Sequence, residues 1–257
     1  MELKLRNRKA LVTGGARGIG RAIAMSLATE GCHVAVVSRT QADVDALLKE
    51  LPGTNHFGMA LDLTLKDAPT TLIESLKKQF GFPEIAIQNL GGTLDITDPF
   101  CPLEDWQRVW RMNFEVALEL NLKLLPQMRE NRWGRIIHIA STSSLENNGP
   151  VTYCTAKAAL AAYTRSMGRV LAKEGIVMSA LVVGAVFTEG GYWDDARKTK
   201  PQHVDEYLRT RCPIGEFGTP EQIAHMVTFL ASDLGNFCQG AIIPIDGGQS
   251  RHFFGEV

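Results

Sequence analysis

Short apolar runs alternate with longer amphipathic stretches from one end of this chain to the other. The apolar runs fall at residues 10–12, 34–37, 58–63, 85–87, 136–140, 176–183 and 241–245. They are continuous in hydrophobicity, which is typical of strands buried on both faces of a parallel sheet. A chain with this pattern has few ways to fold, because helices must cover both faces of such a sheet.

The stretches between these runs have the length and polarity of surface helices. They cover residues 18–30, 41–51, 66–80, 103–129, 151–173 and 220–231. Gly31 stops the first, and Thr219 before Pro220 gives the last a hydroxyl N-cap followed by proline. The alternation predicts an α/β fold, namely a single doubly wound, Rossmann-type domain over residues 1–257. It would have a parallel sheet of about seven strands with helices on both faces.

Composition and charge narrow the classes of function. The formal net charge is -1, so no strong field attracts nucleic acid or an anionic membrane. No apolar run reaches the ~18 residues of a membrane helix, and the polar N-terminus lacks the apolar core of a secretory signal. The five cysteines lack a C-x-x-C pattern and the six histidines lack metal spacing. We expect a cytoplasmic protein with reduced thiols, no metal site, and no nucleic-acid or membrane partner.

A glycine-rich turn follows the first apolar run. Residues 13–20 read T-G-G-A-R-G-I-G, and Gly14, Gly18 and Gly20 set a G-x-x-x-G-x-G spacing, wider than the G-x-G-x-x-G fingerprint. Glycines let the backbone approach a pyrophosphate, and the following helix offers its N-terminal N–H groups to the phosphates. A tight turn without a ligand would also use glycines, but the position after the first strand favours dinucleotide binding.

The end of the second predicted strand bears on the choice of dinucleotide. An NAD enzyme usually places Asp or Glu there to bind the ribose 2′-hydroxyl, whereas this chain has Ser38 and Arg39 and no acid until Asp43. Arg17 and Arg39 suit a 2′-phosphate, because guanidinium groups bind that oxyanion well. NADP(H) is therefore favoured as the cofactor. NAD(H) stays open, because both arginines could be ordinary surface residues.

A serine, a tyrosine and a lysine have a spacing that suits carbonyl chemistry. Ser141 directly follows the fifth predicted strand, Tyr153 comes twelve residues later, and Lys157 follows four residues after Tyr153. Positions i and i+4 share a helix face, so the phenol and the ammonium lie side by side at the carboxyl end of the sheet. An exposed helical pair is the simpler alternative, which the upstream serine and the glycine turn disfavour.

Carbonyl reduction adds hydride to carbon and a proton to oxygen, so it needs an acid against that oxygen. Tyrosine has an ordinary pKa of about 10, and a neighbouring ammonium lowers the pKa toward working pH. A serine hydroxyl can orient the carbonyl and stabilise charge on its oxygen. The set predicts Tyr153 as proton donor, Lys157 as the group that lowers its pKa, and Ser141 as the carbonyl-binding hydroxyl.

These motifs, in this order and over nearly the whole chain, resemble those of the classical short-chain dehydrogenase/reductase family. Residues 13–20 match its T-G-x-x-x-G-x-G turn, and residues 89–92, N-L-G-G, resemble the motif that ends its fourth strand. The resemblance implies a catalytic tetrad. Its members here would be Asn113, which holds a water for proton relay, Ser141, Tyr153 and Lys157.

The resemblance also implies a set of cofactor contacts. Asp62 would contact the adenine, Lys157 the nicotinamide ribose, and Thr188 the carboxamide. Together with the glycine turn and the strand ends, the expected contacts are Gly14, Arg17, Gly18, Ile19, Gly20, Ser38, Arg39, Asp62, Leu63, Asn89, Gly91, Tyr153, Lys157, Val186 and Thr188.

The chain departs from the family pattern near this site. Val183-Gly184 stands where the family commonly has Pro-Gly after the sixth strand, and Gln88 replaces a common asparagine. The interval from serine to tyrosine is one residue shorter than in many relatives. Ser143 is therefore a rival to Ser141 for the carbonyl-binding role.

The segment at residues 187–213 falls where the family has its substrate loop, and long segments of this kind are often lids. Tyr192 and Trp193 could wall an apolar or ring-shaped substrate, or they could pack the loop on the body. Basic and acidic residues interleave further on, which favours a solvated mixed-charge helix over a site for an anionic substrate. Residues 239–248 resemble the family's closing strand, so we expect a homo-oligomer, either a tetramer or a dimer.

The sequence predicts an NADP(H)-dependent oxidoreductase that interconverts a small-molecule carbonyl compound and a secondary alcohol, with Tyr153 as general acid/base. Two alternatives stay open. One is an epimerase or dehydratase that acts on a sugar-like substrate with the same groups, and the other is a dinucleotide-binding regulator without chemistry. The complete tetrad counts against the regulator, which has no need of that geometry. No motif specifies the substrate.

Overall fold

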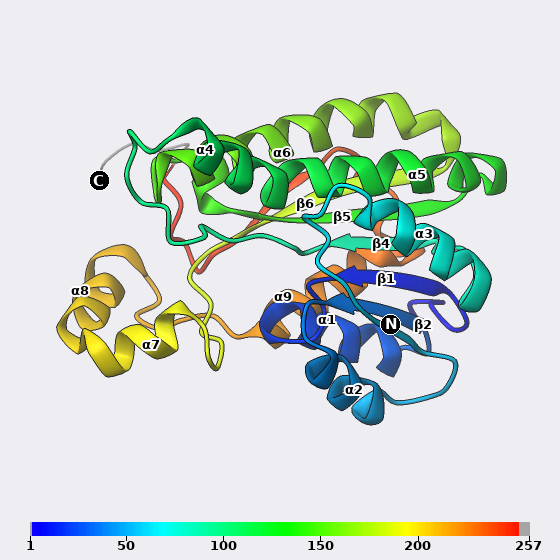
Figure 1. Ribbon diagram of the computed structural model, residues 1–257, viewed down its shortest axis with the longest axis horizontal. Helices are drawn as coiled ribbons and strands as arrows, with labels where there is room; N and C mark the ends of the chain where they lie inside the picture. Colours follow the sequence, from blue (N-terminus) through cyan, green and yellow to red (C-terminus); the bar gives the residue numbers. More distant parts are fainter. Residues whose placement is uncertain (1, 252–257) are drawn as a thin grey trace.

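A parallel sheet of seven strands forms the centre of the structure, a computed structural model that describes residues 2–251 (Figure 1). The strands are β1 (Lys9–Thr13), β2 (His33–Ser38), β3 (Phe57–Ala60), β4 (Ile85–Gln88), β5 (Gly134–Ser141), β6 (Ile176–Val183) and β7 (Ile242–Ile245). Their order in space is β3-β2-β1-β4-β5-β6-β7. The order reverses direction between β1 and β4, and doubly wound folds bind ligands at the carboxyl ends of strands at such a switch point. The predicted fold class is confirmed.

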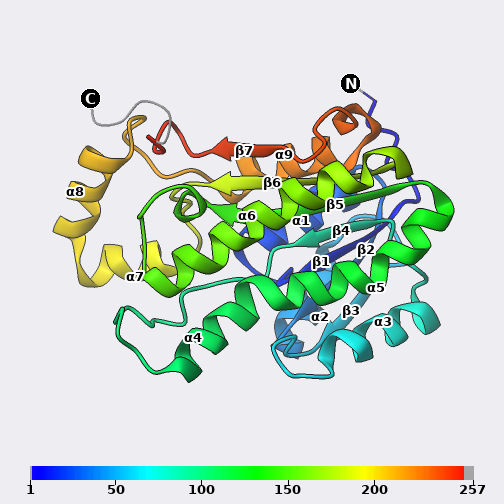
Figure 2. The same ribbon diagram turned by 90° about the horizontal axis from the view of Figure 1, so that it is seen from above.

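Helices cover both faces of the sheet (Figure 2). The helices on one face are α1 (Gly18–Thr29), α2 (Gln41–Glu50) and α9 (Pro220–Ala231), and those on the other are α3 (Ala68–Gln79), α5 (Val116–Asn131) and α6 (Val151–Leu171). Along β2, Val34 and Val36 belong to the first core and Ala35 and Val37 to the second. Both sides of the strand are buried, so its sequence is continuously apolar. Within residues 2–251 none of the helices has the length and apolarity to cross a membrane.

The segments predicted from periodicity lie close to the observed elements. The helix predicted at residues 220–231 coincides with α9, whose N-terminus has a capping box between Thr219 and Gln222. The third strand differs, because the prediction of residues 58–63 runs past its end. β3 is the edge strand and pairs only with β2, and that pairing stops at Ser38 opposite Ala60.

A π-helical turn interrupts the helix that the sequence predicts at residues 103–129. α4 (Leu103–Trp110) continues through the π-turn Arg111–Glu115 into α5. Such turns are rare and occur mostly at functional sites. The middle residue of this one is Asn113, a predicted catalytic residue.

Two short helices fill most of the predicted substrate loop. α7 (Tyr192–Thr199) and α8 (Pro201–Arg211) contact each other and project beyond the carboxyl ends of the strands (Figure 1). The ring centroid of Trp193 lies 4.4 Å from that of Tyr207 and 4.7 Å from that of Phe217, whereas Tyr192 is exposed. Trp193 therefore packs α7 against α8 and against Phe217, and we refer to α7 and α8 together as the lid.

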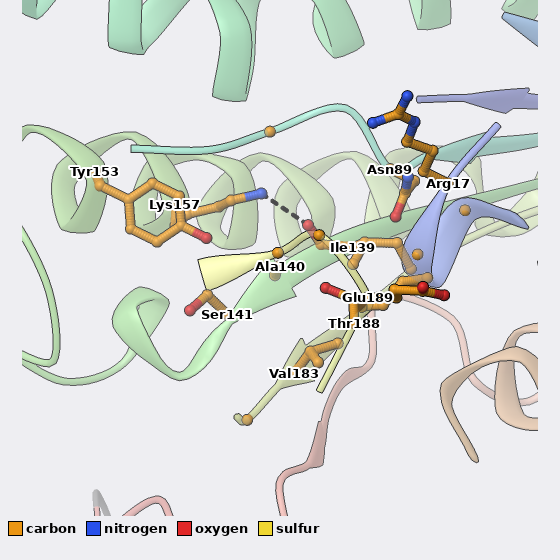
Figure 3. Close-up of a pocket in the computed structure, with 17 residues that line it drawn as sticks. Arg17, Asn89, Ile139, Ala140, Ser141, Tyr153, Lys157, Val183, Thr188 and Glu189 are labelled. Atoms are coloured by element: carbon orange, nitrogen blue, oxygen red, sulfur yellow. Dashed lines mark hydrogen bonds between the residues drawn. The ribbon is translucent and has the colours of Figure 1, made fainter. Parts of the chain in front are cut away.

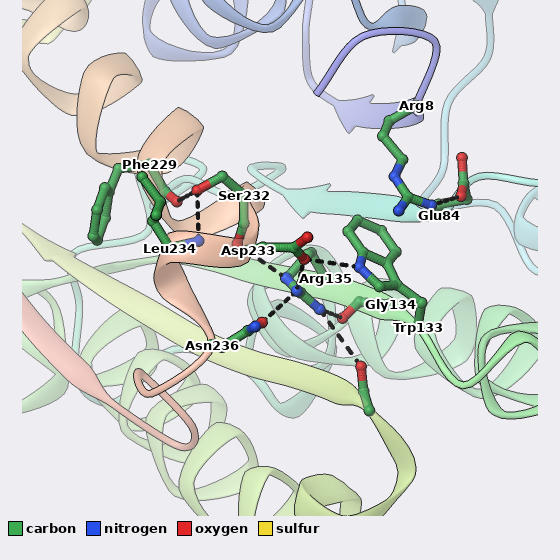
Figure 4. Close-up of polar contacts among 11 residues, drawn as sticks. Arg8, Glu84, Trp133, Gly134, Arg135, Phe229, Ser232, Asp233, Leu234 and Asn236 are labelled. Atoms are coloured by element: carbon green, nitrogen blue, oxygen red, sulfur yellow. Dashed lines mark hydrogen bonds and ion pairs between the residues drawn. The ribbon is translucent and has the colours of Figure 1, made fainter. Parts of the chain in front are cut away.

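The buried Arg135 lies at the opposite, amino-terminal edge of the sheet (Figure 4). The guanidinium of Arg135, on β5, donates to Asp233 Oδ1 at 2.7 Å and to the carbonyl oxygen of Ser232 at 3.2 Å. It stacks 4.3 Å from the ring centroid of Trp133, whose indole N–H donates to the same Asp233 oxygen at 3.0 Å. Arg8 stacks on this indole as well, 3.8 Å from the centroid. These contacts fix β5 to the segment that follows α9.

Candidate active site

The turn between β1 and α1 packs against the end of β4. Gly14 has a φ of +60°, in the left-handed region that glycine adopts readily. A Cβ on Gly20 would lie 2.2 Å from the carbonyl oxygen of Gly14 and 2.6 Å from Asn89 Nδ2, so only glycine fits there. Asn89 Nδ2 donates to the carbonyl oxygens of Thr13 and Gly14 at 3.1 and 3.0 Å. The motif residues therefore hold one another in a tight turn at the carboxyl edge of the sheet.

A cavity of about 370 Å³ opens beside this turn (Figure 3). The predicted site residues that line it are Arg17, Gly18, Ile19, Gly20, Asn89, Gly91, Ser141, Tyr153, Lys157 and Thr188. In Figure 3 the catalytic candidates lie on one side of the cavity, and Arg17 and Asn89 lie on the other. One cavity thus contains the predicted phosphate-binding turn and the predicted proton donor.

The remaining predicted residues lie around this cavity. Arg39 and Asp62 line a second hollow of about 620 Å³ beyond the ends of β2 and β3. Leu63 is buried in the core on the side of α3. Besides Leu63, the predicted residues that line neither space are Gly14, Ser38, Asn113 and Val186.

Several lining residues were missed by sequence reasoning. Glu189, Gly190 and Gly191 line the cavity directly after Thr188, and Ile139 and Ala140 line it from β5. The Gly-Gly pair was a faint signal of a loop that approaches a ligand, but nothing local marked Glu189. The strand residues could not be found from motifs, because they are ordinary apolar residues of β5.

Lys157 reaches the cavity from α6 and is bound to the neighbouring strand. Its Nζ donates a 2.8 Å hydrogen bond to the carbonyl oxygen of Ile139 on β5. The side chain is buried, and desolvation lowers the pKa of Lys157 from 10.5 to about 8. Its Nζ lies 5.7 Å from the ring centroid of Tyr153. The amine is therefore fixed beside the phenol and titrates near physiological pH.

Tyr153 lies one helical turn before Lys157 and faces Ser141. Burial raises the pKa of the Tyr153 phenol, and the nearby Ser141 hydroxyl opposes the rise. The expectation that Lys157 lowers this pKa is not met in the structure, because desolvation is the largest effect and the ammonium is bound to Ile139. The phenol is accordingly protonated at neutral pH and can act as a proton donor.

Ser141 and Ser143 have different surroundings at the end of β5. Ser141 lines the cavity together with Tyr153, and its Oγ accepts from the N–H of Ser143 at 3.2 Å. The Ser143 hydroxyl is buried and donates to the carbonyl oxygen of Asn148 at 2.8 Å. This geometry favours Ser141 over its rival for contact with a carbonyl next to Tyr153.

Asn113 is held in the π-turn by backbone groups. Its Nδ2 donates to the carbonyl oxygens of Gly92 and Val109, each at 2.8 Å, and its Oδ1 accepts from the N–H of Gly92 at 3.0 Å. Both amide hydrogens are used, so the side chain has no free donor for a water. A Cβ on Gly91 would lie 2.8 Å from Asn113 Oδ1 and 2.9 Å from Lys157 Nζ. Asn113 therefore fixes the loop after β4 closely against Lys157.

The turn after β6 has a support that the sequence did not indicate. A Cβ on Gly184 would lie 2.7 Å from the Cα of Asp246, so glycine is needed where the segment after β7 passes. The buried Gln249 accepts from the N–H of Ala185 at 3.0 Å and donates to the Tyr207 hydroxyl on α8. Gln249 thus connects the turn at Val183-Gly184 to the lid. No local motif could signal this contact, because its three residues come from distant parts of the chain.

The shape and the donors of the site fit a dinucleotide. α1 has no side-chain cap at its N-terminus, and residues of its first turn line the cavity. Its first N–H groups are therefore available to phosphate oxygens. The two hollows together follow the carboxyl edge of the sheet, from residues after β2 and β3 to the ends of β5 and β6. This suits an elongated ligand with a central pyrophosphate.

Comparison with curated proteins gives matches over nearly the full chain. Residues 14–250 match the family model described as enoyl-(acyl carrier protein) reductase. The chain is 31% identical over 253 residues to the 3-oxoacyl-(acyl-carrier-protein) reductase FabG of Aquifex aeolicus, covering 97% of this chain and 100% of that one. It is 32% identical over 240 residues to FabG of Haemophilus influenzae, covering 93% and 96%.

Solved structures agree with the fold and its dimensions. L-sorbose reductase from Gluconobacter frateurii, complexed with NADPH and L-sorbose, has a TM-score of 0.89 at 26% identity, covering 97% of this chain and 98% of that chain. A 3-oxoacyl (acyl-carrier-protein) reductase from Agrobacterium tumefaciens C58 with NADP bound has a TM-score of 0.89 at 31% identity, covering 96% of each. The predicted enzyme class, an NAD(P)-dependent oxidoreductase, is confirmed, and the chain belongs to the classical short-chain dehydrogenase/reductase family.

Proposed function

We propose that this protein reduces a ketone to a secondary alcohol with NADPH, and that Tyr153 donates the proton. The observation that carries the proposal is the phenol of Tyr153, whose pKa burial raises and which lines the same cavity as Ser141, Lys157 and the glycine turn. When bound, the cofactor supplies the hydride. NADPH and NADP are bound in the two structural neighbours, which supports NADP(H) as the cofactor of this chain.

Each residue has its own part in delivering the proton. The Ser141 hydroxyl donates to the substrate carbonyl oxygen and orients it toward Tyr153. The Tyr153 hydroxyl transfers its proton to that oxygen. Lys157, whose ammonium is bound to Ile139, would hold the nicotinamide ribose. Asn113 donates hydrogen bonds to the backbone of Gly92 and Val109, and in this way it holds the neighbouring Gly91 against Lys157.

The two alternative functions are less favoured by the site and by the relatives. An epimerase or dehydratase would regenerate its cofactor in each cycle, whereas the curated relatives are named as reductases. A regulator without chemistry would have no use for a buried lysine and a phenol aligned with a serine at the edge of a cavity.

The relatives suggest which substrates to test first. The FabG proteins are named for 3-oxoacyl-(acyl-carrier-protein), and the Gluconobacter enzyme for L-sorbose. We therefore propose that the substrate is a carbonyl compound of one of these two classes. The loop at residues 187–213 of the single catalytic domain would select it. We further propose a cytoplasmic homo-oligomer, because residues 239–248 resemble the closing strand through which family members often assemble.

Replacing the phenol tests the mechanism directly. Tyr153→Phe is expected to lower kcat by at least about 100-fold, because general acid catalysis is lost, while fluorescence titration shows unchanged NADPH affinity. Tyr163→Phe is the matched control, since Tyr163 lies on the same helix and does not line the cavity. Ser141→Ala should lower kcat more than Ser143→Ala. Near-normal turnover by Tyr153→Phe would refute the mechanism.

A further inference from the structure

Arg17, which the sequence assigns to the cofactor 2′-phosphate, already has a carboxylate partner in the protein. Its Nε lies 2.7 Å from Asp43 Oδ2, and its NH2 donates to Asp43 Oδ1 at 2.8 Å. This is a two-point contact of the kind that guanidinium and carboxylate groups form with good geometry. The partners come from different elements, because Arg17 directly precedes α1 and Asp43 lies in the first turn of α2.

The pair lies at the cofactor cavity. Arg17 lines the cavity beside Gly18, with its side chain 72% exposed, whereas Asp43 is 20% exposed and packs behind it. Arg39 lines the adjacent hollow and has no ion pair among the described residues. The two arginines expected to bind a 2′-phosphate are therefore not equivalent, since Arg39 is open to a ligand and Arg17 is held by an acid.

The surroundings of Asp43 keep it charged. The hydrogen bond from Arg17 holds the pKa of the Asp43 carboxyl below its ordinary value. Its place in the first turn of α2 favours a negative charge as well, because the amino end of a helix is electropositive. The formal charge of Arg17, Arg39 and Asp43 together is +1, where the two arginines alone would give +2.

We propose that Asp43 is a specificity-determining residue that competes with the cofactor 2′-phosphate for Arg17 and so limits the preference of this enzyme for NADP(H) over NAD(H). The inference rests on the proposed function, since it assumes that the dinucleotide binds along this edge of the sheet. The two-point contact uses the Nε and NH2 edge of the guanidinium. A 2′-phosphate must therefore displace Asp43 from that edge or accept the remaining edge, with the carboxylate charge nearby.

Asp43→Asn tests this competition through binding alone. We expect the affinity for NADPH to rise by about twofold to fivefold, as for one exposed charge–charge contact, and the affinity for NADH to stay unchanged. The gain should shrink as the salt concentration rises, because exposed charges are screened. Dissociation constants for both cofactors are measured by fluorescence titration, and circular dichroism verifies that the variant is folded.

Two further variants make the result specific. Asp45→Asn is the matched control. Asp45 lies on the same helix, but it accepts its hydrogen bond from Gln41 and contacts no arginine among the described residues. Adding Arg17→Met to Asp43→Asn should abolish the gain in NADPH affinity. The proposal is overturned if Asp43→Asn leaves NADPH affinity unchanged or lowers it, since a lowered affinity would mean that Asp43 positions Arg17 for the phosphate. A gain that survives Arg17→Met also overturns it.

The outcome separates this inference from the proposed function. If the wild-type protein binds NADPH and only the Asp43→Asn result disagrees, the competition fails and the cofactor assignment stands. If the wild-type protein binds neither NADPH nor NADH, the proposed function fails and the inference falls with it.

Discussion

The Nζ of Lys157 donates a 2.8 Å hydrogen bond to the carbonyl oxygen of Ile139, and this bond ties α6 to β5 where the cavity begins. A carbonyl dipole compensates only part of the hydration that a buried ammonium loses, so burial brings the pKa of Lys157 down to about 8. Burial also raises the pKa of the neighbouring Tyr153 phenol. The site is therefore poised with the proton on tyrosine.

This protonation state predicts different pH profiles for the two directions of the reaction. Because burial raises the pKa of Tyr153, the phenol can donate a proton across neutral pH, whereas alcohol oxidation needs the phenolate as a base. We expect kcat/KM for ketone reduction to stay level through neutral pH, and kcat/KM for oxidation to rise by about tenfold per pH unit in the same range. A flat oxidation profile there would show that the phenolate already predominates.

Much of the site could be predicted because its signals are local. The spacing of the glycines and the i,i+4 relation of Tyr153 to Lys157 follow from turn and helix geometry, whatever the rest of the fold does. The direction of the Tyr153 pKa shift could not be predicted, since it depends on how much of the folded protein covers the ring. The spacing in the sequence reveals the neighbouring charge of Lys157. It does not reveal the desolvation of the phenol, which is the largest effect on the pKa of Tyr153.

Features built from distant segments also escaped prediction. The sequence left open whether Trp193 walls a substrate or packs the loop, and its contacts with Tyr207 and Phe217 depend on how three segments fold together. The π-turn at Asn113 likewise depends on Gly92, which lies 21 residues earlier in the chain. Periodicity detects which residues are buried, but it does not show which ones meet.

Gln88, a departure from the family pattern, begins a buried chain of polar side chains. Its Nε2 donates to Asn121 Oδ1 at 2.9 Å, Asn121 Nδ2 contacts His138 Nε2 at 2.9 Å, and His138 Nδ1 contacts Thr164 Oγ1 at 2.7 Å. Thr164 in turn donates to the carbonyl oxygen of Leu160. The donors and acceptors agree only if the imidazole is neutral with its proton on Nδ1. Burial accordingly lowers the pKa of His138 to about 3.

The buried imidazole predicts a loss of stability in mild acid. An unfolded chain protonates His138 below an ordinary pKa of 6.5, whereas the folded chain resists protonation until about 3. The stabilisation is therefore full above pH 6.5 and falls as the pH drops, by up to about 1.4 kcal/mol per unit. Urea unfolding should show that the stability difference between wild type and His138→Gln shrinks from pH 7.5 to pH 5. The exposed His225, replaced by glutamine, is the control, and a constant difference for His138→Gln would contradict the prediction.

The Arg135 cluster at the opposite edge of the sheet predicts a purely structural effect (Figure 4). Asp233→Ala leaves a guanidinium that is 2% exposed without its carboxylate, although Asn236 still contacts it. We expect the free energy of unfolding to fall by about 2 kcal/mol, because an uncompensated buried charge is costly. Glu206→Ala removes an exposed partner of Arg209 and should cost less than about 0.5 kcal/mol. NADPH affinity should not change in either variant; a loss of affinity in Asp233→Ala would show coupling along β5.

Gln249 predicts a variant that affects the substrate more than the cofactor. Gln249→Leu leaves the N–H of Ala185 without its acceptor and frees the Tyr207 hydroxyl, so the lid loses its connection to the turn after β6. We expect KM for the carbonyl substrate to rise several-fold, while the dissociation constant for NADPH changes little, because Ala185 and Tyr207 do not line the cavity beside the glycine turn. Gln249→Glu keeps an acceptor for Ala185 and can accept from Tyr207, so it should restore much of the loss. Gln202→Leu, an exposed glutamine on α8, is the matched control. Equal rises in KM and in the NADPH dissociation constant would instead mean that Gln249 supports the whole edge of the sheet and not the lid.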